Sequence, residues 1–226
     1  MTLRTGGQSA APFQSNNLGV YVGDSQAACN RAQLKYALQL PSEPLWLKQV
    51  HGTNCLDAAD LENEAQADAI WTDTPGRVLA IQTADCLPVL FADAEATVVA
   101  AAHAGWRGLL NGVLENTLEA MPVDSPKVHC WLGAAIGPCC FEVGDEVRQA
   151  FVDRDAQDEV AFQALPNKKW LADLYQLSKR RLKMAGVTQV HGGGLCTACD
   201  DQQFFSYRRD QGQTGRMASL IWLLGE

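Results

Sequence analysis

The sequence predicts a mixed α/β fold, with an α+β-like mixed sheet and flanking helices, built as a single domain over residues 1–226. Two patterns indicate this class. Short apolar runs typical of strands fill the middle third of the chain, and runs with helical spacing follow them. In addition, 47% of the residues are hydrophobic, which is enough for a large core, and no repeat or long linker divides the chain.

Local patterns predict the elements of the first half. Small and apolar positions from Ser25 onward predict a helix, and Pro41 ends it. Apolar runs typical of buried strands follow this helix. The predicted strands cover 45–50, 69–71, 78–82, 88–91 and 97–102, and a hairpin turn covers 93–95.

The second half alternates between helices and strands. After His103 and a turn at Gly105, the apolar positions of 109–118 fall on one face of a helix. Asp173 is suited to cap a further helix, and Gly186 stands where helices favour glycine at their end. The other predicted elements are strands at 128–132, 187–190, 204–207 and 217–223, a rigid loop at 137–140 and a helix at 145–152.

Charge and composition narrow the function classes. With 18 Lys+Arg against 26 Asp+Glu, the net charge of -8 argues against broad contact with nucleic-acid phosphates and favours small-molecule substrates. The N-terminus has no apolar signal core, and no apolar run approaches the roughly 18 residues of a membrane span. We therefore expect a cytoplasmic monomer or small homo-oligomer with no nucleic-acid partner and no membrane partner.

Three residues at the ends of predicted strands are candidate metal ligands. His51, Cys86 and His103 stand where α/β folds usually place ligand sites. Two imidazoles and one thiolate suit an ion such as zinc and leave a fourth position for water or substrate. The residues alone leave two alternatives open. The three side chains can be unrelated, or Cys86 can be a nucleophile with His103 as its base and Asp85 or an amide as the orienting group.

The other cysteines give weaker signals. Eight cysteines in a chain of this length without a secretion signal indicate reduced thiols rather than a disulfide framework. Cys196-Thr-Ala-Cys199 is compatible with half of a zinc site, with Cys139-Cys140 as the other half, or with a redox pair. Because no thioredoxin-like context surrounds the pair, we interpret these four as structural or incidental thiols.

Arginines supply candidates for anion binding. Arg107 falls in the first turn of a predicted helix, where free N–H groups favour phosphate. Alternation along a strand over 204–207 sends Arg208 and Arg209 to opposite faces, so we assign Arg208, in phase with Phe204, to the site. The full set of candidate arginines is Arg4, Arg107, Arg208, Arg209 and Arg216.

Absent motifs argue against two enzyme classes. The H-x-E and P-C-x-x-C signature of zinc nucleobase deaminases does not occur. Four histidines without an H-x-H pair are too few for the paired imidazoles of a true multicopper oxidase.

Ordered motif blocks run along nearly the whole chain. They are Arg4-Thr-Gly-Gly, Asn17-Leu-Gly, Lys48-Gln-Val-His51-Gly, Thr83-Ala-Asp-Cys86-Leu-Pro-Val, His103-Ala-Gly-Trp-Arg107-Gly, Gly133-Ala-Ala-Ile-Gly-Pro138, Cys196-Thr, Phe204-Phe-Ser-Tyr-Arg208-Arg and Thr214-Gly-Arg216. This set resembles the YfiH or laccase-domain family, also called polyphenol oxidase or purine nucleoside phosphorylase. The resemblance implies that His51, Cys86 and His103 bind a metal, usually zinc and in some members copper.

The resemblance also implies an activity. It leads us to hypothesise a metal-dependent purine nucleoside phosphorylase that converts adenosine, inosine and methylthioadenosine to base and ribose 1-phosphate, with adenosine deaminase side activity. The assigned catalytic residues are Cys86, His51 and His103, and the assigned substrate-binding residues are Arg4, Asn17, Arg107 and Arg208. The alternatives are a cysteine hydrolase, amidase or peptidoglycan-precursor editing factor that uses Cys86, a laccase-like polyphenol oxidase with bound copper, and a metal-containing binding protein without turnover.

The chain departs from the family pattern at two places. Family members usually begin with a further strand before the Arg4 block, so the resemblance predicts a truncated or misassigned start. Cys199 and the doubled Cys139-Cys140 are not part of the pattern, which favours an incidental role for them.

Overall fold

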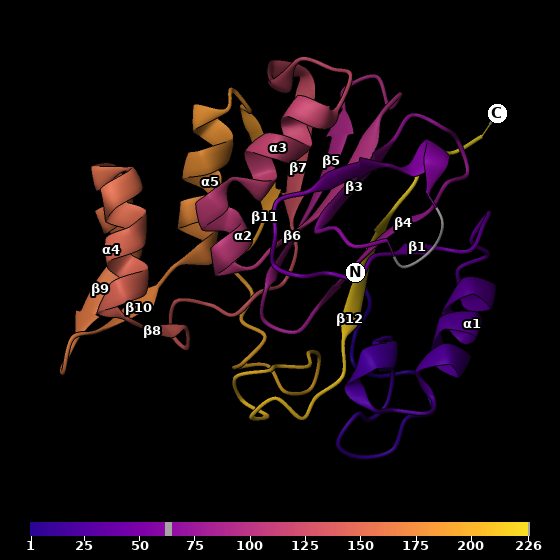
Figure 1. Cartoon of the computed structure of the whole chain (residues 1–226). Coiled ribbons are helices and arrows are strands. Elements are labelled where there is room, and N and C mark those ends of the chain that lie inside the picture. The colour runs from indigo at the N-terminus through magenta and orange to yellow at the C-terminus, as the bar shows by residue number, and fades with distance from the viewer. Residues whose placement is uncertain (62–64, 226) are drawn as a thin grey trace.

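A central sheet of six strands organises the computed structural model, which describes residues 1–61 and 65–225 (Figure 1). The strand order β11-β7-β5-β6-β3-β2 mixes parallel and antiparallel pairs, so the predicted mixed α/β class is confirmed. The strands are β2 (Cys55–Asp57), β3 (Ala69–Thr72), β5 (Leu87–Asp93), β6 (Val99–Ala104), β7 (Val128–Leu132) and β11 (Gln189–Gly192).

A second, three-stranded sheet packs on one face of the central sheet. Ile81 of this sheet lies in one apolar layer with Ile70 and Val99 of the central sheet. On its other side, Leu34 of helix α1 (Ala27–Ala37) packs against Trp46, and Figure 1 shows α1 beyond this sheet. The strands, in the order β1-β4-β12, are β1 (Leu45–Trp46), β4 (Leu79–Thr83) and β12 (Met217–Ile221).

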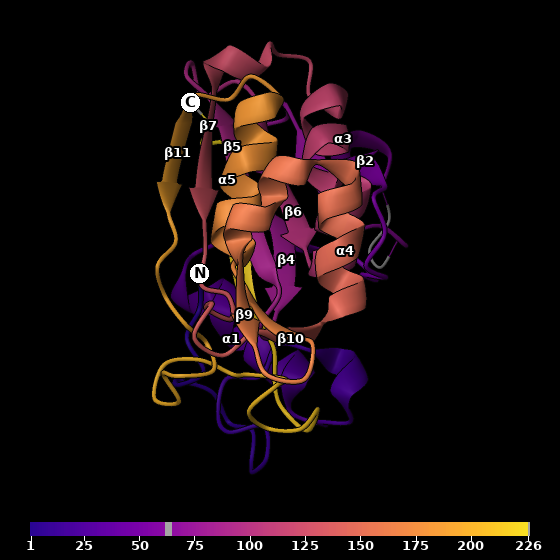
Figure 2. The same cartoon turned by 90° about the vertical axis from the view of Figure 1, so that its left-hand side faces the viewer.

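Helices cover the other face of the central sheet (Figures 1 and 2). Phe91 of the sheet shares the main core with Leu114 and Leu182 of these helices. The covering helices are α2 (Trp106–Asn111), α3 (Val113–Ala120) and α5 (Leu174–Met184). At the side stand α4 (Asp145–Arg154) and a small antiparallel sheet of β8 (Glu142–Gly144), β10 (Lys169–Ala172) and β9 (Phe162–Leu165). Short 3-10 helices are η1 (Val20–Val22), η2 (Ala58–Asp60), η3 (Ser125–Lys127) and η4 (Ala156–Ala161).

Strand β6 carries its side chains into both layers. Ala100 and Ala102 face the helices, whereas Val99 and Ala101 face the second sheet. Because these side chains are small, both layers approach the backbone closely. The strand is buried along its whole length, so the histidine near its carboxyl end, His103, is held in the core.

Several strand ends meet at one edge of the molecule. Strand β4 ends at Thr83 and β5 begins at Leu87, with only a short turn between them. Strand β6 runs antiparallel to β5, and its His103 pairs with Pro88. The long segment between β11 and β12, gold in the lower part of Figure 1, reaches the same edge, because Thr197 and Ser206 hydrogen bond to Asp85 in the β4–β5 turn.

The structure corrects some of the predicted elements. Residues 204–207 form no strand. Phe204 and Phe205 are buried beside Met217, but this segment lies between turns and makes no strand pairing. The helix predicted through 109–118 is broken at Gly112, whose φ of 102° ends one helix and begins the next. The strand predicted at 45–50 is limited to β1.

Other predicted elements occur close to their expected positions. The strand at 128–132 is β7 as predicted, and Asp173 caps α5 through a hydrogen bond from the Gln176 backbone N–H. Strands β2, β8, β9 and β10 were not predicted. Among residues 1–61 and 65–225, no helix combines the length and apolar character needed to cross a membrane.

Candidate metal centre and substrate cavity

The three predicted ligand residues meet at the edge where the strands end. The donor atoms of His51, Cys86 and His103 all lie within 4.8 Å of one another. Cys86 Sγ is 3.7 Å from His51 Nε2, and the two imidazole rings meet edge to face with centroids 4.8 Å apart. The fold therefore brings together residues that are far apart in the sequence, which rules out three unrelated side chains.

Unusual backbone conformations place these side chains. His51 has a φ of 60° and Asp85, next to Cys86, has a φ of 89°, values that non-glycine residues rarely adopt. Gly105 follows β6 and allows the cluster to close. A Cβ atom at this position would lie 2.9 Å from His51 Cδ2 and 3.0 Å from Cys86 Sγ, so only glycine fits without displacing a ligand.

Asp68 is a buried carboxylate that orients two of the three residues. Its Oδ1 accepts a hydrogen bond from His103 Nδ1 at 2.8 Å, which leaves His103 Nε2 free to face Cys86. The same carboxylate accepts backbone N–H groups from Val50, His51 and Gly52. Asp68 thus fixes both the imidazole of His103 and the strained turn that carries His51.

The electrostatics of the cluster favour a thiolate. Burial raises the pKa of Cys86, but the charge and hydrogen bonds of His103 and His51 outweigh burial and lower this pKa to about 6. Burial lowers the pKa of His103, but the Cys86 thiolate and Asp68 raise it to about 9. The two shifts run in opposite directions, and together they favour a thiolate at Cys86 beside an imidazolium at His103.

Asp85 does not orient His103, contrary to one alternative from the sequence. Its Oδ1 accepts the hydroxyl of Thr197 at 2.6 Å, and its Oδ2 accepts the hydroxyl of Ser206 at 3.0 Å and the backbone N–H of Arg208 at 2.7 Å. The carboxylate ties the β11–β12 segment to the turn that carries Cys86. Asp68 has the orienting position that the sequence left open.

A cavity of about 550 Å³ adjoins the cluster, a volume typical of small-molecule sites. Its wall carries the aromatic rings of Tyr21, Phe141 and Tyr207, which offer flat apolar surfaces. Lys48 also lines it. The complete lining is Gly19, Tyr21, Val22, Leu47, Lys48, Gln49, His51, Gln82, Thr83, Ala84, Asp85, Cys86, His103, Arg107, Ile136, Phe141, Tyr207, Arg208 and Arg216.

Three arginines give the cavity a positive wall in an acidic protein. Arg107, Arg208 and Arg216 line it, and among the described residues none of the three has a carboxylate partner. Arg208 donates to the backbone oxygen of Glu142 at 3.0 Å, and Arg216 donates to the backbone oxygen of Thr214 at 2.9 Å. Burial lowers the pKa of Arg216. Arg216 is half-buried, whereas Arg107 and Arg208 are exposed. Guanidinium groups without a counter-ion favour an anionic ligand.

The structure places the other assigned residues away from the cavity wall. Arg4 donates to the backbone oxygens of Gln14 and Asp201 and stacks over Phe205. Asn17 is fully buried, and its Oδ1 accepts the N–H groups of Gly19 and Arg216. Both hold the loops behind the wall, and their assignment to substrate binding stays a prediction.

Arg209 likewise belongs to the support of the wall. It pairs with Asp210 and donates to the backbone oxygens of Thr197 and Phe204. Arg208 lines the cavity and Arg209 does not, although the cause is a turn rather than the predicted strand alternation. Asp68 has no sequence signal that marks its role, and in the sequence Arg216 is one of several arginines with nothing to distinguish it.

The donor set of the cluster fits a single borderline-soft ion. Two imidazoles and one thiolate are ligands that zinc accepts, and the cavity lies on the open side where a fourth ligand would bind. The hydrogen bond from His103 to buried Asp68 is the second contact that metal-bound histidines usually make. His51, Cys86 and His103 are thus the residues that would hold such an ion.

The family match and the similar sequences point to the same group of proteins. The protein family described as multi-copper polyphenol oxidoreductase laccase matches residues 1–224. The chain is 50% identical over 224 residues to a protein of Escherichia coli named purine nucleoside phosphorylase YfiH, covering 98% of this chain and 91% of that protein. A purine nucleoside phosphorylase of Pseudomonas aeruginosa is 49% identical, covering 99% and 92%.

Solved structures give the same grouping. A protein of Neisseria meningitidis superposes with a TM-score of 0.96 at 47% identity, covering 100% of this chain and 93% of that one. YlmD from Geobacillus stearothermophilus superposes with a TM-score of 0.93 at 30% identity, covering 99% and 90%. These similarities extend over the sheets, the helices and the segments that form the cavity.

Proposed function

This chain belongs to the family described as multi-copper polyphenol oxidoreductase laccase, and from that premise we propose that it is a metal-dependent purine nucleoside phosphorylase. Two of its relatives carry that activity in their names. The observation that carries the proposal is a cluster of two histidines and one cysteine beside a cavity with three guanidinium groups, none of which has a carboxylate partner among the described residues. Adenosine, inosine and methylthioadenosine are the proposed substrates.

The proposed reaction needs an anion site beside a site for a flat base. Inorganic phosphate attacks the anomeric carbon of the ribose, the bond from that carbon to the purine nitrogen breaks, and the base leaves with the electron pair. Arg107, Arg208 and Arg216 are suited to bind phosphate and to reduce its charge repulsion with the nucleoside. The rings of Tyr207 and Phe141 are suited to stack against the purine.

The cluster contributes the metal site to this proposal. A bound ion supplies a Lewis acid and lowers the pKa of a bound water, the chemistry that adenosine deamination requires as a side activity. His51 and His103 provide neutral imidazoles, and Cys86 provides a thiolate whose pKa of about 6 needs little further lowering. Asp68 binds the Nδ1 side of the His103 ring and leaves Nε2 as the atom that would bind the ion.

Separation of products by chromatography tests the proposal. Inosine, adenosine and methylthioadenosine are incubated with zinc-loaded protein, with and without phosphate. We expect free base only when phosphate is present, together with ribose 1-phosphate from inosine and adenosine and 5-methylthioribose 1-phosphate from methylthioadenosine. We also expect some inosine from adenosine in both conditions. Base release no greater than that of a chelator-treated Cys86→Ala control would overturn the phosphorylase proposal.

One observation favours a second candidate, a cysteine hydrolase or amidase that acts on a peptidoglycan precursor. Cys86, His103 and Asp68 form a chain of nucleophile, base and orienting carboxylate. The two functions differ in their need for metal. A hydrolase would keep its activity after chelation and lose it on alkylation of Cys86, whereas the phosphorylase would lose its activity on chelation.

A further inference from the structure

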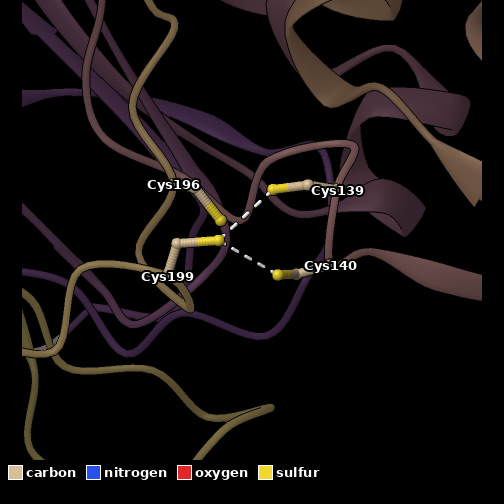
Figure 3. A group of neighbouring side chains, drawn as sticks. All are labelled: Cys139, Cys140, Cys196 and Cys199. Carbon is tan, nitrogen blue, oxygen red and sulfur yellow. Dashed lines mark hydrogen bonds between the residues drawn. The ribbon is translucent and has the colours of Figure 1, made fainter.

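A second group of cysteines lies outside the cavity. Cys139 and Cys140 belong to the loop between β7 and β8, and Cys196 and Cys199 follow β11. The four sulfur atoms lie within 4.8 Å of one another, and Figure 3 shows the two pairs facing across a small gap. We call these four residues the tetracysteine cluster, and we propose that it binds one zinc ion in a tetrahedral, purely structural site.

The distances suit a single tetrahedral ion. Cys199 Sγ is 3.4 Å from Cys139 Sγ and 3.3 Å from Cys140 Sγ. Zinc–sulfur bonds of about 2.3 Å in a regular tetrahedron place the sulfurs roughly 3.8 Å apart, so a small outward movement admits the ion. An iron–sulfur cluster distributes its four thiolates over two or four irons, so at least some of the sulfurs must lie much further apart than they do here.

Hydrophobic burial does not explain these cysteines. Cys130 in β7 is buried in the main core and represents a cysteine that packs as a small apolar side chain. Cys139 and Cys199 are instead exposed, and Cys140 and Cys196 are half-buried. Four thiols that come together at or near the surface are explained if they bind a shared cation.

A disulfide explains the arrangement less well. Cys199 Sγ is almost equally far from Cys139 and Cys140, so the distances select no particular disulfide pairing. The backbone N–H of Gly137 also points at Cys196 Sγ at 3.2 Å. Such N–H contacts stabilise a thiolate that is bound to metal.

The backbone holds both loops in place before any ion binds. The N–H of Thr197 donates to the Ala135 oxygen at 3.0 Å and aligns the two cysteine pairs. The loops also carry part of the cavity wall, because Arg208 donates to the Cys140 oxygen and Phe141 follows Cys140 directly. A zinc ion with four protein ligands leaves no position for substrate, so its role would be to fasten this wall.

Metal content and cobalt spectra test the proposal. Binding exchanges the thiol protons for one divalent ion without any redox step. Fully reduced Cys86→Ala protein, which lacks a ligand of the other site, is titrated with Zn²⁺ and with Co²⁺. We expect one equivalent of zinc per chain and strong thiolate-to-cobalt charge-transfer bands. Adding Cys196→Ser and Cys199→Ser should abolish the zinc binding and the cobalt bands. Adding Cys29→Ser, a change at an exposed cysteine outside the cluster, should alter neither the zinc binding nor the bands.

The outcomes separate this site from the proposed activity. Reduced Cys86→Ala protein that binds neither zinc nor cobalt would overturn the tetracysteine site and leave the phosphorylase proposal unaffected. Should Cys86→Ala fail to fold, chelator-stripped wild-type protein serves in the same titration. It should then bind two equivalents, and the Cys196→Ser/Cys199→Ser variant should bind one. Wild-type protein that binds only one equivalent, with no decrease in this variant, would contradict the proposal.

Discussion

The two sulfur-containing clusters differ in what surrounds them. The cluster of His51, Cys86 and His103 has a buried carboxylate, Asp68, behind it and a cavity of about 550 Å³ in front of it. The tetracysteine cluster has four equivalent ligands on two surface loops, and none of the four lines that cavity. Three ligands beside a cavity leave a coordination position for chemistry, whereas four ligands close the coordination shell.

The comparison also shows how each cluster is supported. Asp68 takes part in four hydrogen bonds that fix one ring and one strained turn, so the three-residue cluster has a rigid and charged second layer. The tetracysteine cluster is supported by backbone contacts such as that from Gly137. We therefore expect the first cluster to control activity and the second to control mainly stability.

The largest expected effect is the loss of metal from single-residue variants of the first cluster. His51→Ala, Cys86→Ala and His103→Ala should each lose one equivalent, because two remaining ligands hold zinc weakly, while the large apolar core keeps the fold. Elemental mass spectrometry measures the metal content, and circular dichroism measures the folding. Normal metal content in one of the three variants would remove that residue from the ligand set.

A smaller loss is expected at the cavity wall. Arg208→Lys keeps the charge but loses the planar, two-pronged guanidinium, so kcat/KM for phosphate-dependent cleavage should fall by roughly 1.5 to 3 kcal/mol, or about 10- to 150-fold. Metal content should not change. Arg209→Lys is the matched control, because Arg209 pairs with Asp210 and lies outside the cavity lining. A larger kinetic defect at Arg209 would show that the wrong arginine was assigned.

Asp68→Asn probes the layer behind the ligands. The amide keeps the size of the side chain but removes the charge that holds the Nδ1 proton of His103, so zinc affinity should fall by about 10- to 100-fold. Competition with a chromogenic chelator measures this affinity. Asp93→Asn provides a comparison, because Asp93 is also a buried carboxylate that accepts several hydrogen bonds but lies in a hairpin turn. Equal zinc affinity in wild-type protein and Asp68→Asn would contradict the orienting role.

The smallest effect concerns the pH dependence of one thiol in metal-stripped protein. With a pKa of about 6, Cys86 is a thiolate above that pH, so its alkylation rate should rise through pH 6 and level off near neutrality. Cys130, whose pKa burial raises to about 12, should remain unreactive over this range. Peptide mass spectrometry follows each cysteine separately. A Cys86 rate that still rises steeply above pH 8 would exclude the thiolate–imidazolium pair.

The fold was predictable where one local pattern dominates. Strand β7 alternates buried and exposed residues, and the side chain of Asp173 caps the N-terminus of α5. Both elements therefore occur close to their predicted bounds. The segment 204–207 has the same apolar character as a strand. Phe204, Phe205 and Ser206 are buried but Tyr207 is exposed. Long-range hydrogen bonds from Ser206 and Arg208 to Asp85 hold the segment, and sequence periodicity does not report such contacts.

The site was predictable in part. His103 lies near the end of β6 and Cys86 in the turn between β4 and β5, close to their predicted places, whereas His51 follows the short strand β1 only after a loop. The fold nevertheless brings the three side chains together. Asp68 gave no comparable signal, because its role depends on the antiparallel pairing of β3 with β6. The four residues of the tetracysteine cluster are visible in the sequence, but they have no thioredoxin-like context and three of them lie outside the family pattern, which favours an incidental role. Only the fold brings the two pairs together.

The most direct test of the account is phosphate-dependent release of hypoxanthine from inosine when each cluster is disabled in turn. We expect Cys86→Ala to abolish hypoxanthine release. We expect Cys199→Ser to be as active as wild-type protein at low temperature but to be inactivated at a lower temperature on heating. Hypoxanthine release by Cys86→Ala equal to that of wild-type protein, with its zinc content reduced by one equivalent, would contradict the central claim that the His51–Cys86–His103 cluster is the catalytic centre.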